Sequence, residues 1–380
     1  MKILIVTEYF PESAECEVRG GVEARAFYFA KELAKEHVVT VLCAREVGQG
    51  EEDIFLGFTV YRCGIARAYA QGGSIFSRFS FLWSAIWRGR SLEIDVVDGY
   101  NFIAYLAAFF IALGRRGIRK IATYHDVWIG EWIRNVGLVS GIFGEILERF
   151  SLRVSWDGII AVSEYTKNKL IARRMNPQKI IVIPNGVDIK EYESVQVKKF
   201  EHPTVAYVGR LVEYKRVEDL LHAIKIVKKK IPEVQCKIIG SGPRENKLKA
   251  LARELGIDRR VEFLGFVPER KDVIALVKRS HVFCLPSLVE GFGMVTIEAM
   301  AAGLPFVNSD IPATREITGG GIGGLLFEPK NIEDLAEKIV LTLGAQNVSD
   351  HQSLQKDRLF RMYEWNRLSY ILVEAYKHIV

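Results

Sequence analysis

The alternation of short apolar strands with helical segments is the feature that most restricts what this chain can fold into. Runs of β-branched and apolar residues recur along the sequence, and each is followed by a segment whose apolar residues have helical spacing. This alternation is typical of parallel βαβ units, in which a helix returns the chain to the same edge of the sheet. Neither half of the chain has a short repeat, which excludes a solenoid. The sequence therefore predicts α/β architecture with parallel sheets.

The expected strands form two sets. The strands of the first half are Lys2–Thr7, Val38–Cys43, Phe58–Cys63, Ile94–Asp98, Ile118–Thr123, Gly158–Val162 and Ile180–Ile183. Those of the second half are Thr204–Val208, Val234–Ile239, Val261–Phe263, Val282–Leu285 and Pro305–Val307. A chain of 380 residues exceeds what one hydrophobic core usually serves. We therefore expect two Rossmann-like domains that face each other across a cleft, with ligands at the carboxyl ends of the strands.

The boundary between the two domains is expected near Pro184–Asn185–Gly186, because these residues interrupt regular structure. A polar stretch from Glu191 to Glu201 follows and resembles a linker. We therefore assign residues 1–190 to an N-terminal, acceptor-side domain and residues 200–363 to a C-terminal, nucleotide-sugar-binding domain. The last segment, residues 364–380, has a helical stripe of apolar residues that needs an apolar partner.

Composition excludes several classes of protein. The formal net charge of +6 is mild, and no nucleic-acid-binding module is evident, so we expect no nucleic-acid partner. Five cysteines without a CxxC pair argue against a disulfide framework or a zinc site and are typical of a reducing compartment. The longest apolar stretch, Phe102 to Leu113, is shorter than the roughly 20 residues of a spanning helix. These observations favour a cytoplasmic protein.

Two glutamates separated by seven residues, Glu290 and Glu298, form the strongest chemical signal. Between them, Gly291 and Gly293 allow a tight turn into a helix that starts near Met294. A helix start offers unpaired backbone N–H groups, which suit a phosphate. A carboxylate at Glu298, between apolar helix residues, needs nearby donors, and the paired hydroxyls of a ribose would supply two. The simpler interpretation is a core helix with one satisfied glutamate.

A second signal follows the first strand of the second half, where Gly209 precedes Arg210 and Lys215 comes five residues later. Two fixed cations at the end of a strand suit a diphosphate, since arginine binds in a bidentate manner and lysine acts as a point charge. An ordinary solvated loop is the alternative. The glycine turn Gly240–Ser241–Gly242–Pro243 follows the next strand and carries little weight alone.

In the first half, Gly20 and Gly21 open a helix expected over residues 22–35, as a phosphate-binding loop does. The pattern is neither a complete GxGxxG nor a Walker sequence. His125 follows the strand that ends at Thr123, so its imidazole could contact a sugar hydroxyl or the reacting centre. A single histidine is more often structural.

Together these motifs resemble the retaining family-four glycosyltransferases of GT-B fold. The resemblance covers nearly the whole chain. The motifs that carry it, in order, are the glycines at 20–21, His125-Asp126, Val162-Ser163, Pro184-Asn185-Gly186-Val187-Asp188, Gly209-Arg210-Leu211 with Lys215, Gly240 to Pro243, Leu264-Gly265-Phe266, the paired glutamates, and Glu298 to Gly303. The sequence departs from the family at Arg216, where glycine usually follows the phosphate-binding lysine.

The resemblance implies roles for these residues. Arg210 and Lys215 would hold the donor diphosphate, Glu298 the ribose, and Glu290 the transferred sugar, together with the backbone amides that follow it. Those amides belong to Phe292, Gly293 and Met294. His125 would approach the donor sugar from the other domain, Gly20 and Gly21 would lie at the phosphates, and Val267 would meet the base through its backbone. Helix 364–380 would cross back to the N-terminal domain.

The implied activity is transfer of a hexose from a UDP- or GDP-sugar to an acceptor hydroxyl, on a glycan or a lipid-linked sugar, with retention of anomeric configuration. A sugar-nucleotide epimerase of GT-B fold and a catalytically silent nucleotide-sugar-binding protein remain alternatives. A dinucleotide oxidoreductase is disfavoured because no complete GxGxxG with a following acidic residue is present. No Asp-x-Asp triplet occurs, so we expect neither a metal nor another cofactor.

The segment 54–92 contains no aspartate or glutamate but five arginines. Phe76, Phe79, Trp83 and Trp87 recur within it at helical spacing. Basic and aromatic side chains on one helix suit an anionic membrane surface, which would make the protein peripheral on the inner face of the membrane. The alternative is an ordinary crossover helix whose aromatic stripe packs against the sheet.

Overall fold

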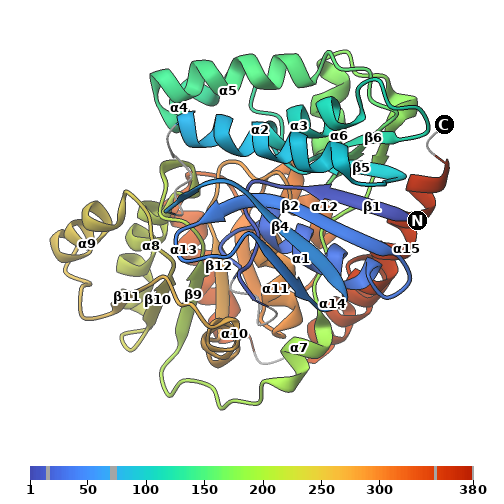
Figure 1. Cartoon of the computed structure of the whole chain (residues 1–380). Helices are drawn as coiled ribbons and strands as arrows, with labels where there is room; N and C mark the ends of the chain where they lie inside the picture. Colours follow the sequence, from blue (N-terminus) through green and yellow to red (C-terminus); the bar gives the residue numbers. More distant parts are fainter. Residues whose placement is uncertain (14–17, 69–74, 346–348, 379–380) are drawn as a thin grey trace. The chain divides into compact units, whose positions relative to one another are not determined.

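The computed structural model of the chain describes residues 1–13, 18–68, 75–345 and 349–378. It divides into two compact units, which Figure 1 shows in ribbon form. Unit 1 comprises Met1–Asn185 and Trp365–Val380, and unit 2 comprises Gly186–Glu364. The division falls at Asn185, so residues 186–190 belong with the second unit and not, as the sequence predicts, with the first.

Unit 1 is built on one eight-stranded sheet with the order β3-β4-β2-β1-β5-β6-β7-β8. Its strands are β1 (Lys2–Val6), β2 (Val38–Glu46), β3 (Glu52–Phe55), β4 (Phe58–Arg67), β5 (Val96–Gly99), β6 (Arg119–Tyr124), β7 (Gly158–Ala161) and β8 (Ile180–Val182). All neighbours are parallel except the β3–β4 pair. Strand β3 is not among the strands expected from the sequence, since this edge strand has acidic residues and no buried face.

Helices cover both faces of this sheet, and its central strands are accordingly apolar on both sides. The helical segments of unit 1 are α1 (Gly21–Leu33), α2 (Ile75–Ser91), α3 (Phe102–Ala112), α4 (Trp132–Val136), α5 (Leu138–Ser151), α6 (Glu164–Ala172), η1 (Pro177–Lys179) and α15 (Trp365–His378). One core lies between the sheet and the helices α2 and α3, with Phe81 and Ile111 fully enclosed. In Figure 1, α2, α3 and α5 lie together on one side of the sheet.

The C-terminal helix α15 packs against α1 within unit 1. The indole of Trp365 stacks on Tyr28, with ring centroids 5.3 Å apart, and meets Phe29 edge-on at 5.1 Å. Farther along the helix, the Tyr376 hydroxyl donates to Asp98 Oδ2 over 2.7 Å. The apolar stripe of this segment thus finds its partner in the first unit.

Unit 2 contains a six-stranded, all-parallel sheet with the order β11-β10-β9-β12-β13-β14. Its strands are β9 (Thr204–Val208), β10 (Gln235–Ile239), β11 (Val261–Gly265), β12 (Val282–Leu285), β13 (Phe306–Ser309) and β14 (Gly324–Phe327). Strand β14, a four-residue strand that follows a run of glycines, is not among the strands expected from the sequence. Both sheets have the doubly wound order of a Rossmann-like fold.

The helical segments of unit 2 are α7 (Ile189–Ser194), η2 (Glu213–Lys215), α8 (Val217–Lys230), α9 (Glu245–Glu254), α10 (Arg270–Arg279), α11 (Met294–Ala301), α12 (Pro312–Thr318), α13 (Ile332–Gly344) and α14 (Ser349–Met362). Helix α7 corrects the expectation that the polar stretch from Glu191 to Glu201 is a linker. Asp188 caps this helix by accepting from the Glu191 N–H, and Tyr192 is buried. Polar residues hid this helix because its only buried face is one turn long.

Candidate active site

The strand order of unit 2 reverses between β9 and β12, which are neighbours in the sheet. The chain leaves β9 toward β10 on one side and leaves β12 toward β13 on the other side. The loops after these two strands therefore diverge and leave space between them. Ligands of open α/β sheets bind at this point. The loop after β9 carries Arg210, and the loop after β12 carries Glu290. The topology therefore brings together the two strongest motifs of the sequence.

Lys215 and Glu290 form an ion pair across these two loops, with Lys215 Nζ 2.5 Å from Glu290 Oε1. Both side chains are largely enclosed, with 13% and 10% of their surfaces exposed. A backbone hydrogen bond from the Leu288 N–H to the Tyr214 carbonyl, 2.8 Å long, joins the same loops. An ammonium group has three protons, so Lys215 can hold Glu290 and still donate to a ligand.

Arg210 is exposed at the tip of the loop after β9. Its Nη2 donates to the Tyr214 hydroxyl over 2.6 Å, and the Tyr207 hydroxyl donates to its backbone carbonyl over 3.0 Å. Burial raises the pKa of Tyr207 well above its ordinary value, so its hydroxyl keeps its proton. Two tyrosines thus hold both the backbone and the guanidinium of Arg210.

The glycine turn after β10 supports the Arg210 loop. The Leu211 N–H donates to the Ser241 carbonyl over 3.0 Å, and the Gly209 N–H donates to the Ile239 carbonyl over 2.9 Å. A Cβ at Gly242 would lie 2.5 Å from the Leu211 carbonyl oxygen, so only glycine allows this approach. The Gly240 to Pro243 motif is therefore explained by the packing of two loops.

Arg216, the departure from the family pattern, has a left-handed backbone with φ 52° and ψ 40°. Glycine adopts this conformation without strain, whereas another residue loses roughly 1–2 kcal/mol. The Arg216 guanidinium binds both carboxylate oxygens of Asp219, at 2.8 and 2.5 Å. Asp219 is almost fully buried, and the Arg216 guanidinium supplies its countercharge.

Helix α11 begins directly after Glu290, with Gly293 as its N-cap in a left-handed conformation (φ 95°, ψ 52°). Among the described residues, no side chain caps its first turn. The Thr296 N–H donates to the Gly293 carbonyl over 2.9 Å, and the N–H groups before it suit an anion. Phe292 turns inward and packs 5.8 Å from the ring of Tyr363, so only its backbone can serve a ligand. Met294, the first residue of the helix, is half-buried.

Glu298 lies on α11 with 18% of its side chain exposed, and its partner is Arg270. Arg270 Nη1 lies 3.2 Å from Glu298 Oε1, while its Nε lies 2.8 Å from Glu191 Oε2. Arg270 opens α10 at the end of the loop that contains Val267, which is half-buried. Arg270 is not among the site residues expected from the sequence. The one sequence signal for it is its position at the start of a helix, a few residues after the Leu264-Gly265-Phe266 motif.

In unit 1, Gly20 and Gly21 mark the start of α1, where Gly20 is the N-cap and has an extended backbone. Neither its backbone nor its neighbours require glycine, since a Cβ there would meet no atom within 4 Å. Within the described part of the chain, no side chain caps this helix either. A helix start without a side-chain cap suits an anionic ligand.

His125 directly follows β6, and its Nε2 is buried without a hydrogen-bond partner among the described residues. Burial, reinforced by the nearby Arg25 guanidinium, holds the pKa of His125 well below its usual range. The imidazole is therefore neutral at neutral pH. It can exchange hydrogen bonds with a sugar hydroxyl, but it is a poor source of a proton.

Arg25, which the sequence analysis missed, is fully buried on α1 beside this histidine. Its Nη1 lies 2.9 Å from the carbonyl oxygens of Ile183 and Pro184 and from Asn185 Oδ1. The motif Pro184 to Asp188 is therefore more than the turn that its sequence indicates, because a buried guanidinium holds its first residues. The long sequence separation between Arg25 and this motif gave no signal of the contact.

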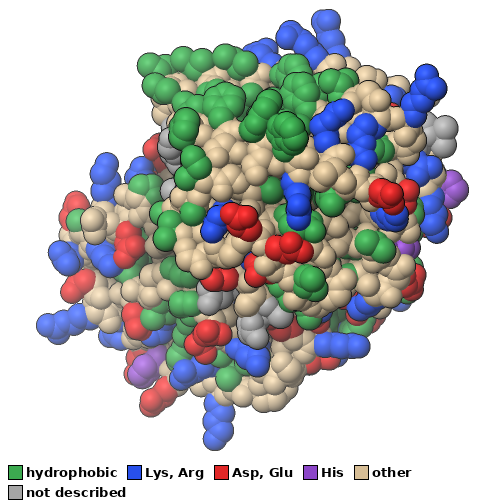
Figure 2. All heavy atoms as spheres, in the orientation of Figure 1, with side chains coloured by type: hydrophobic (Ala, Val, Ile, Leu, Met, Phe, Trp, Pro, Cys, Tyr) green, Lys and Arg blue, Asp and Glu red, His purple; other side chains and the backbone are tan. Residues whose placement is uncertain are grey.

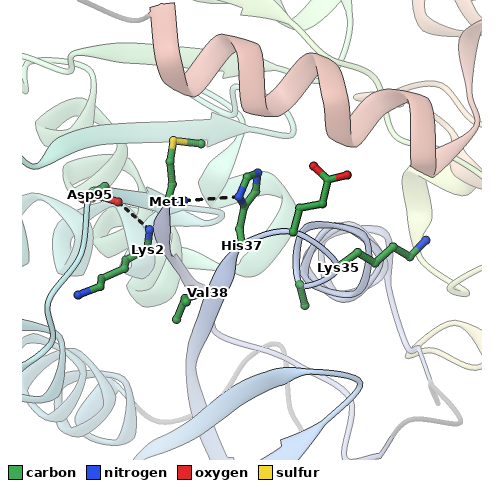
Figure 3. Close-up of a pocket in the computed structure, with 8 residues that line it drawn as sticks. Met1, Lys2, Lys35, His37, Val38 and Asp95 are labelled. Carbon is green, nitrogen blue, oxygen red and sulfur yellow. Dashed lines mark hydrogen bonds between the residues drawn. The ribbon is translucent and has the colours of Figure 1, made fainter.

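A surface pocket lies at the opposite edge of the first sheet, at the amino ends of β1 and β2 (Figure 3). Met1, His37 and Asp95 are among its lining residues. The Lys2 N–H donates to Asp95 Oδ2 over 2.7 Å there. None of the residues that the sequence predicts for the site lines this pocket, and the chemistry of an α/β sheet belongs to the other edge.

The structure thus gathers Arg210, Lys215, Glu290 and the start of α11 at one edge of the second sheet. Glu298 and the Val267 loop are joined by Arg270 in the same unit. Gly20, Gly21 and His125 lie separately in unit 1, at the carboxyl edge of the first sheet. Within the described part of the chain, no three His, Cys, Asp or Glu side chains are grouped as a metal site would require.

Comparison with known proteins identifies the class and then the family. The family model for "Glycosyltransferase Family 4" matches residues 19–191. The family model for "Glycosyl transferases group 1" matches residues 188–354. The two matches meet close to the division between the units. The protein has the domains of a glycosyltransferase of GT-B fold. It belongs to the family-four glycosyltransferases.

An uncharacterized glycosyltransferase from Haemophilus influenzae is 34% identical over 188 residues, which are 49% of this chain and 52% of that protein. The chain thus spans about half the length of this relative. Sucrose-phosphate synthase from Thermosynechococcus elongatus superposes with a TM-score of 0.84 at 18% identity, covering 100% and 98% of the two chains. Anabaena HepE in complex with UDP-glucose gives a TM-score of 0.76 at 19% identity, covering 99% of both chains. Both structures share the fold.

Proposed function

We propose that the protein transfers a hexose from a UDP- or GDP-sugar to an acceptor hydroxyl on a glycan or lipid-linked sugar, with retention of anomeric configuration. The observation that carries the proposal is the Lys215–Glu290 ion pair beside Arg210 and the uncapped start of α11. This edge offers cations and N–H groups for a diphosphate and a carboxylate for sugar hydroxyls. HepE, of the same fold, is known in complex with UDP-glucose.

Departure of the nucleoside diphosphate builds negative charge on the β-phosphate. Lys215, Arg210 and the N–H groups at Gly293 and Met294 would stabilise this charge, and such fixed donors are usually the largest catalytic contribution. Glu290 would keep Lys215 in place while accepting a hydrogen bond from the sugar. Neutral His125 would hydrogen-bond a hydroxyl of the same sugar. Gly20 and Gly21 would leave room for the phosphates.

Glu298 would accept hydrogen bonds from the ribose hydroxyls, while Arg270 keeps its carboxylate oriented. The Val267 backbone would meet the base. In this scheme the charge on the diphosphate is balanced by arginine, lysine and backbone N–H groups. We therefore propose that transfer proceeds without a metal ion or other cofactor.

Thermal unfolding with UDP, GDP, ADP and their sugars tests donor binding, because a ligand of the native state raises its stability. We expect UDP or GDP to raise the melting temperature, and the same sugar nucleotide to release free nucleoside diphosphate when an acceptor is added. Binding without release would favour the catalytically silent alternative. Conversion of the sugar nucleotide without an acceptor would favour the epimerase. No shift with any nucleotide would contradict donor binding altogether.

Chelation tests the metal-independent scheme. We expect turnover to stay within about twofold when EDTA is added at constant pH, because two cationic side chains and a helix start take the role of a bridging cation. Loss of turnover in EDTA, restored by magnesium or manganese, would show that the scheme is wrong.

A further inference from the structure

The outer face of α2 exposes its aromatic side chains. The residues of this stripe, each between 50% and 71% exposed, are Phe76, Phe79, Trp83 and Trp87. The opposite face of the helix is buried through Phe81, Ala85 and Gly89. The alternative, in which the aromatic stripe packs against the sheet, is therefore wrong. A second set of apolar residues fills the core and leaves the aromatic stripe outside.

Helix α5 also exposes large apolar side chains, and the residues that it buries are small or polar. Its exposed large apolar residues, with exposed fractions from 41% to 69%, are Leu138, Val139, Ile142, Ile146 and Phe150. The residues that it buries are Gly141, Gly144, Glu148 and Ser151. A Cβ at Gly141 would lie 2.5 Å from the Ile133 Cα, and one at Gly144 would overlap the Trp132 ring. Close packing through glycine therefore fixes the large aliphatic side chains outward.

The two helices form one continuous surface, called here the apolar face. It consists of the exposed apolar residues of α2 and α5 given above, together with Ile133 of α4. The rings of Phe79 on α2 and Phe143 on α5 meet edge-on, 5.7 Å apart. Both helices pack on α3. Figure 2 shows hydrophobic side chains gathered over this part of unit 1. An apolar surface of this extent is unusual on a monomeric domain and marks a binding surface.

The charged residues beside the apolar face are mostly basic. Arg88, Arg134 and Arg149 are 43%, 72% and 53% exposed, and each is adjacent in sequence to an exposed apolar residue of the face. Each also forms an ion pair, with Glu52, Glu131 and Glu145 respectively. Helix α2 has no acidic residue. Of the two glutamates of α5, Glu148 is buried and accepts from the Trp132 Nε1–H over 2.7 Å, while Glu145 is paired with Arg149. Arg90, at the end of α2, is exposed as well, and its Nη1 donates to the backbone carbonyls of Phe110 and Leu113. Arginine therefore exceeds carboxylate at the rim of the face, which complements an anionic surface.

We propose that the apolar face docks unit 1 onto a bilayer that contains anionic phospholipid. The aliphatic residues of α5 and the rings of α2 enter the interfacial region, while the arginines bind the lipid phosphates. An apolar centre with a basic rim is the arrangement of helices that lie in the membrane interface. No helix among the described residues is long and apolar enough to span a membrane, so the contact is peripheral. The inference does not depend on the donor or the acceptor.

Co-sedimentation with vesicles tests this docking, using phosphatidylcholine alone or phosphatidylcholine mixed with phosphatidylglycerol, at low and high salt. We expect the whole chain to bind the vesicles with phosphatidylglycerol at low salt and to bind them more weakly at high salt, because salt screens the arginines. Negligible binding to both vesicles at both salt concentrations would overturn the proposal.

Paired substitutions separate the two helices. Ile142→Asn with Ile146→Asn, and Trp83→Ala with Trp87→Ala, are each expected to lower vesicle binding roughly tenfold or more, since each pair removes two inserting side chains. The matched control is Ile54→Asn with Leu341→Asn, residues that are 72% and 53% exposed elsewhere on the chain. All these side chains are exposed, so thermal unfolding is expected to stay near that of the wild type. Binding unchanged by both pairs would contradict the assignment.

The basic rim has its own control of equal charge. Arg134→Glu with Arg149→Glu is expected to remove most of the salt-dependent binding. Lys229→Glu with Lys230→Glu, on exposed positions of α8, makes the same change in net charge and is expected to leave binding intact. Equal losses in the two variants would show that only net charge matters. Sedimentation velocity tests whether a second copy of the chain covers the face instead. Self-association that the α5 variant abolishes, in a protein that does not bind vesicles, would assign the face to such a dimer and overturn the proposal.

Discussion

The two units share a doubly wound sheet but differ in how some of their enclosed carboxylates are held. In unit 2, the carboxylates Glu290 and Glu298 are paired with Lys215 and Arg270 at the edge of the sheet. In unit 1, several titratable groups are buried with hydrogen bonds in place of a full countercharge. Burial raises the pKa of Asp98 to about 7, although hydrogen bonds from Tyr376 and Thr123 oppose the shift. Burial also raises the pKa values of Glu23 and Glu148 to about 7.

This difference shows that one topology supports two kinds of polar site. The edge of the second sheet is preorganised for an anion, because its cations are fixed by partners before a ligand arrives. The edge of the first sheet holds neutral polar groups such as His125, whose pKa is kept low by burial and by Arg25. Unit 1 also has the apolar face, for which unit 2 shows no counterpart of similar extent among its described residues. Unit 2 is therefore suited to an anionic ligand, and unit 1 to neutral polar and apolar groups.

The largest expected effect comes from the cations of unit 2. Arg210→Ala and Lys215→Ala are each expected to lower kcat about 10²- to 10³-fold, because each removes a fixed donor to the developing phosphate charge. Steady-state kinetics measures the loss. Lys249→Ala is the control, since this lysine lies on α9 and pairs with its helix neighbour Glu245. A kcat within a few-fold of the wild type for either variant would show that these cations of unit 2 are not the fixed donors to the phosphate.

The pH dependence of the free energy of unfolding tests the buried carboxyl groups of unit 1. Asp98 is protonated more readily in the folded state than in the unfolded state, so its contribution is complete at low pH. That contribution falls as the pH rises from about 4 to about 7, by up to a few kcal/mol in the free energy of unfolding. Urea unfolding across this range should show a smaller pH dependence for Asp98→Asn than for the wild type. Identical slopes would mean that Asp98 does not titrate as described.

Arg270 connects the paired carboxylates of unit 2 to donor binding. Arg270→Ala is expected to raise KM for the donor roughly tenfold, the equivalent of one hydrogen bond, and to leave kcat within a few-fold. The reason is that Glu298 would lose its orientation toward the ribose, a contact present equally in the ground and transition states. A fall in kcat with unchanged KM would instead place Arg270 with the reacting phosphate.

The smallest expected effect concerns Arg216, the strained residue next to the phosphate-binding lysine. Arg216→Ala and Arg216→Gly both lose the Asp219 pair, but only alanine keeps the left-handed strain. The alanine variant is therefore expected to be less stable than the glycine variant by about 1 kcal/mol in urea unfolding. Equal stabilities would show that the backbone relaxes at this position.

Sequence patterns predicted the strands well where the strands are buried on both faces. Thr204–Val208 and Val282–Leu285 have the bounds expected, since a continuous apolar run is the direct consequence of helices on both sides. The exposed edge strand β3 and the helix α7 were missed because neither buries a continuous apolar face. The site motifs of unit 2 were found because they lie within a few residues of strand ends. Whether they bind a donor stays a prediction.

The sequence by itself determined the doubly wound architecture, the family, and the residues that the topology places beside the switch point between β9 and β12. These features depend on local periodicity and on short motifs, which a linear chain displays directly. Only the tertiary structure decided which carboxylate pairs with which cation, because Arg270 and Glu298 lie 28 residues apart and meet only after the sheet forms. It also decided that the aromatic stripe of α2 faces outward. Helical spacing shows which residues share a face, but only the packing of α3 and α5 shows which of two apolar faces is covered.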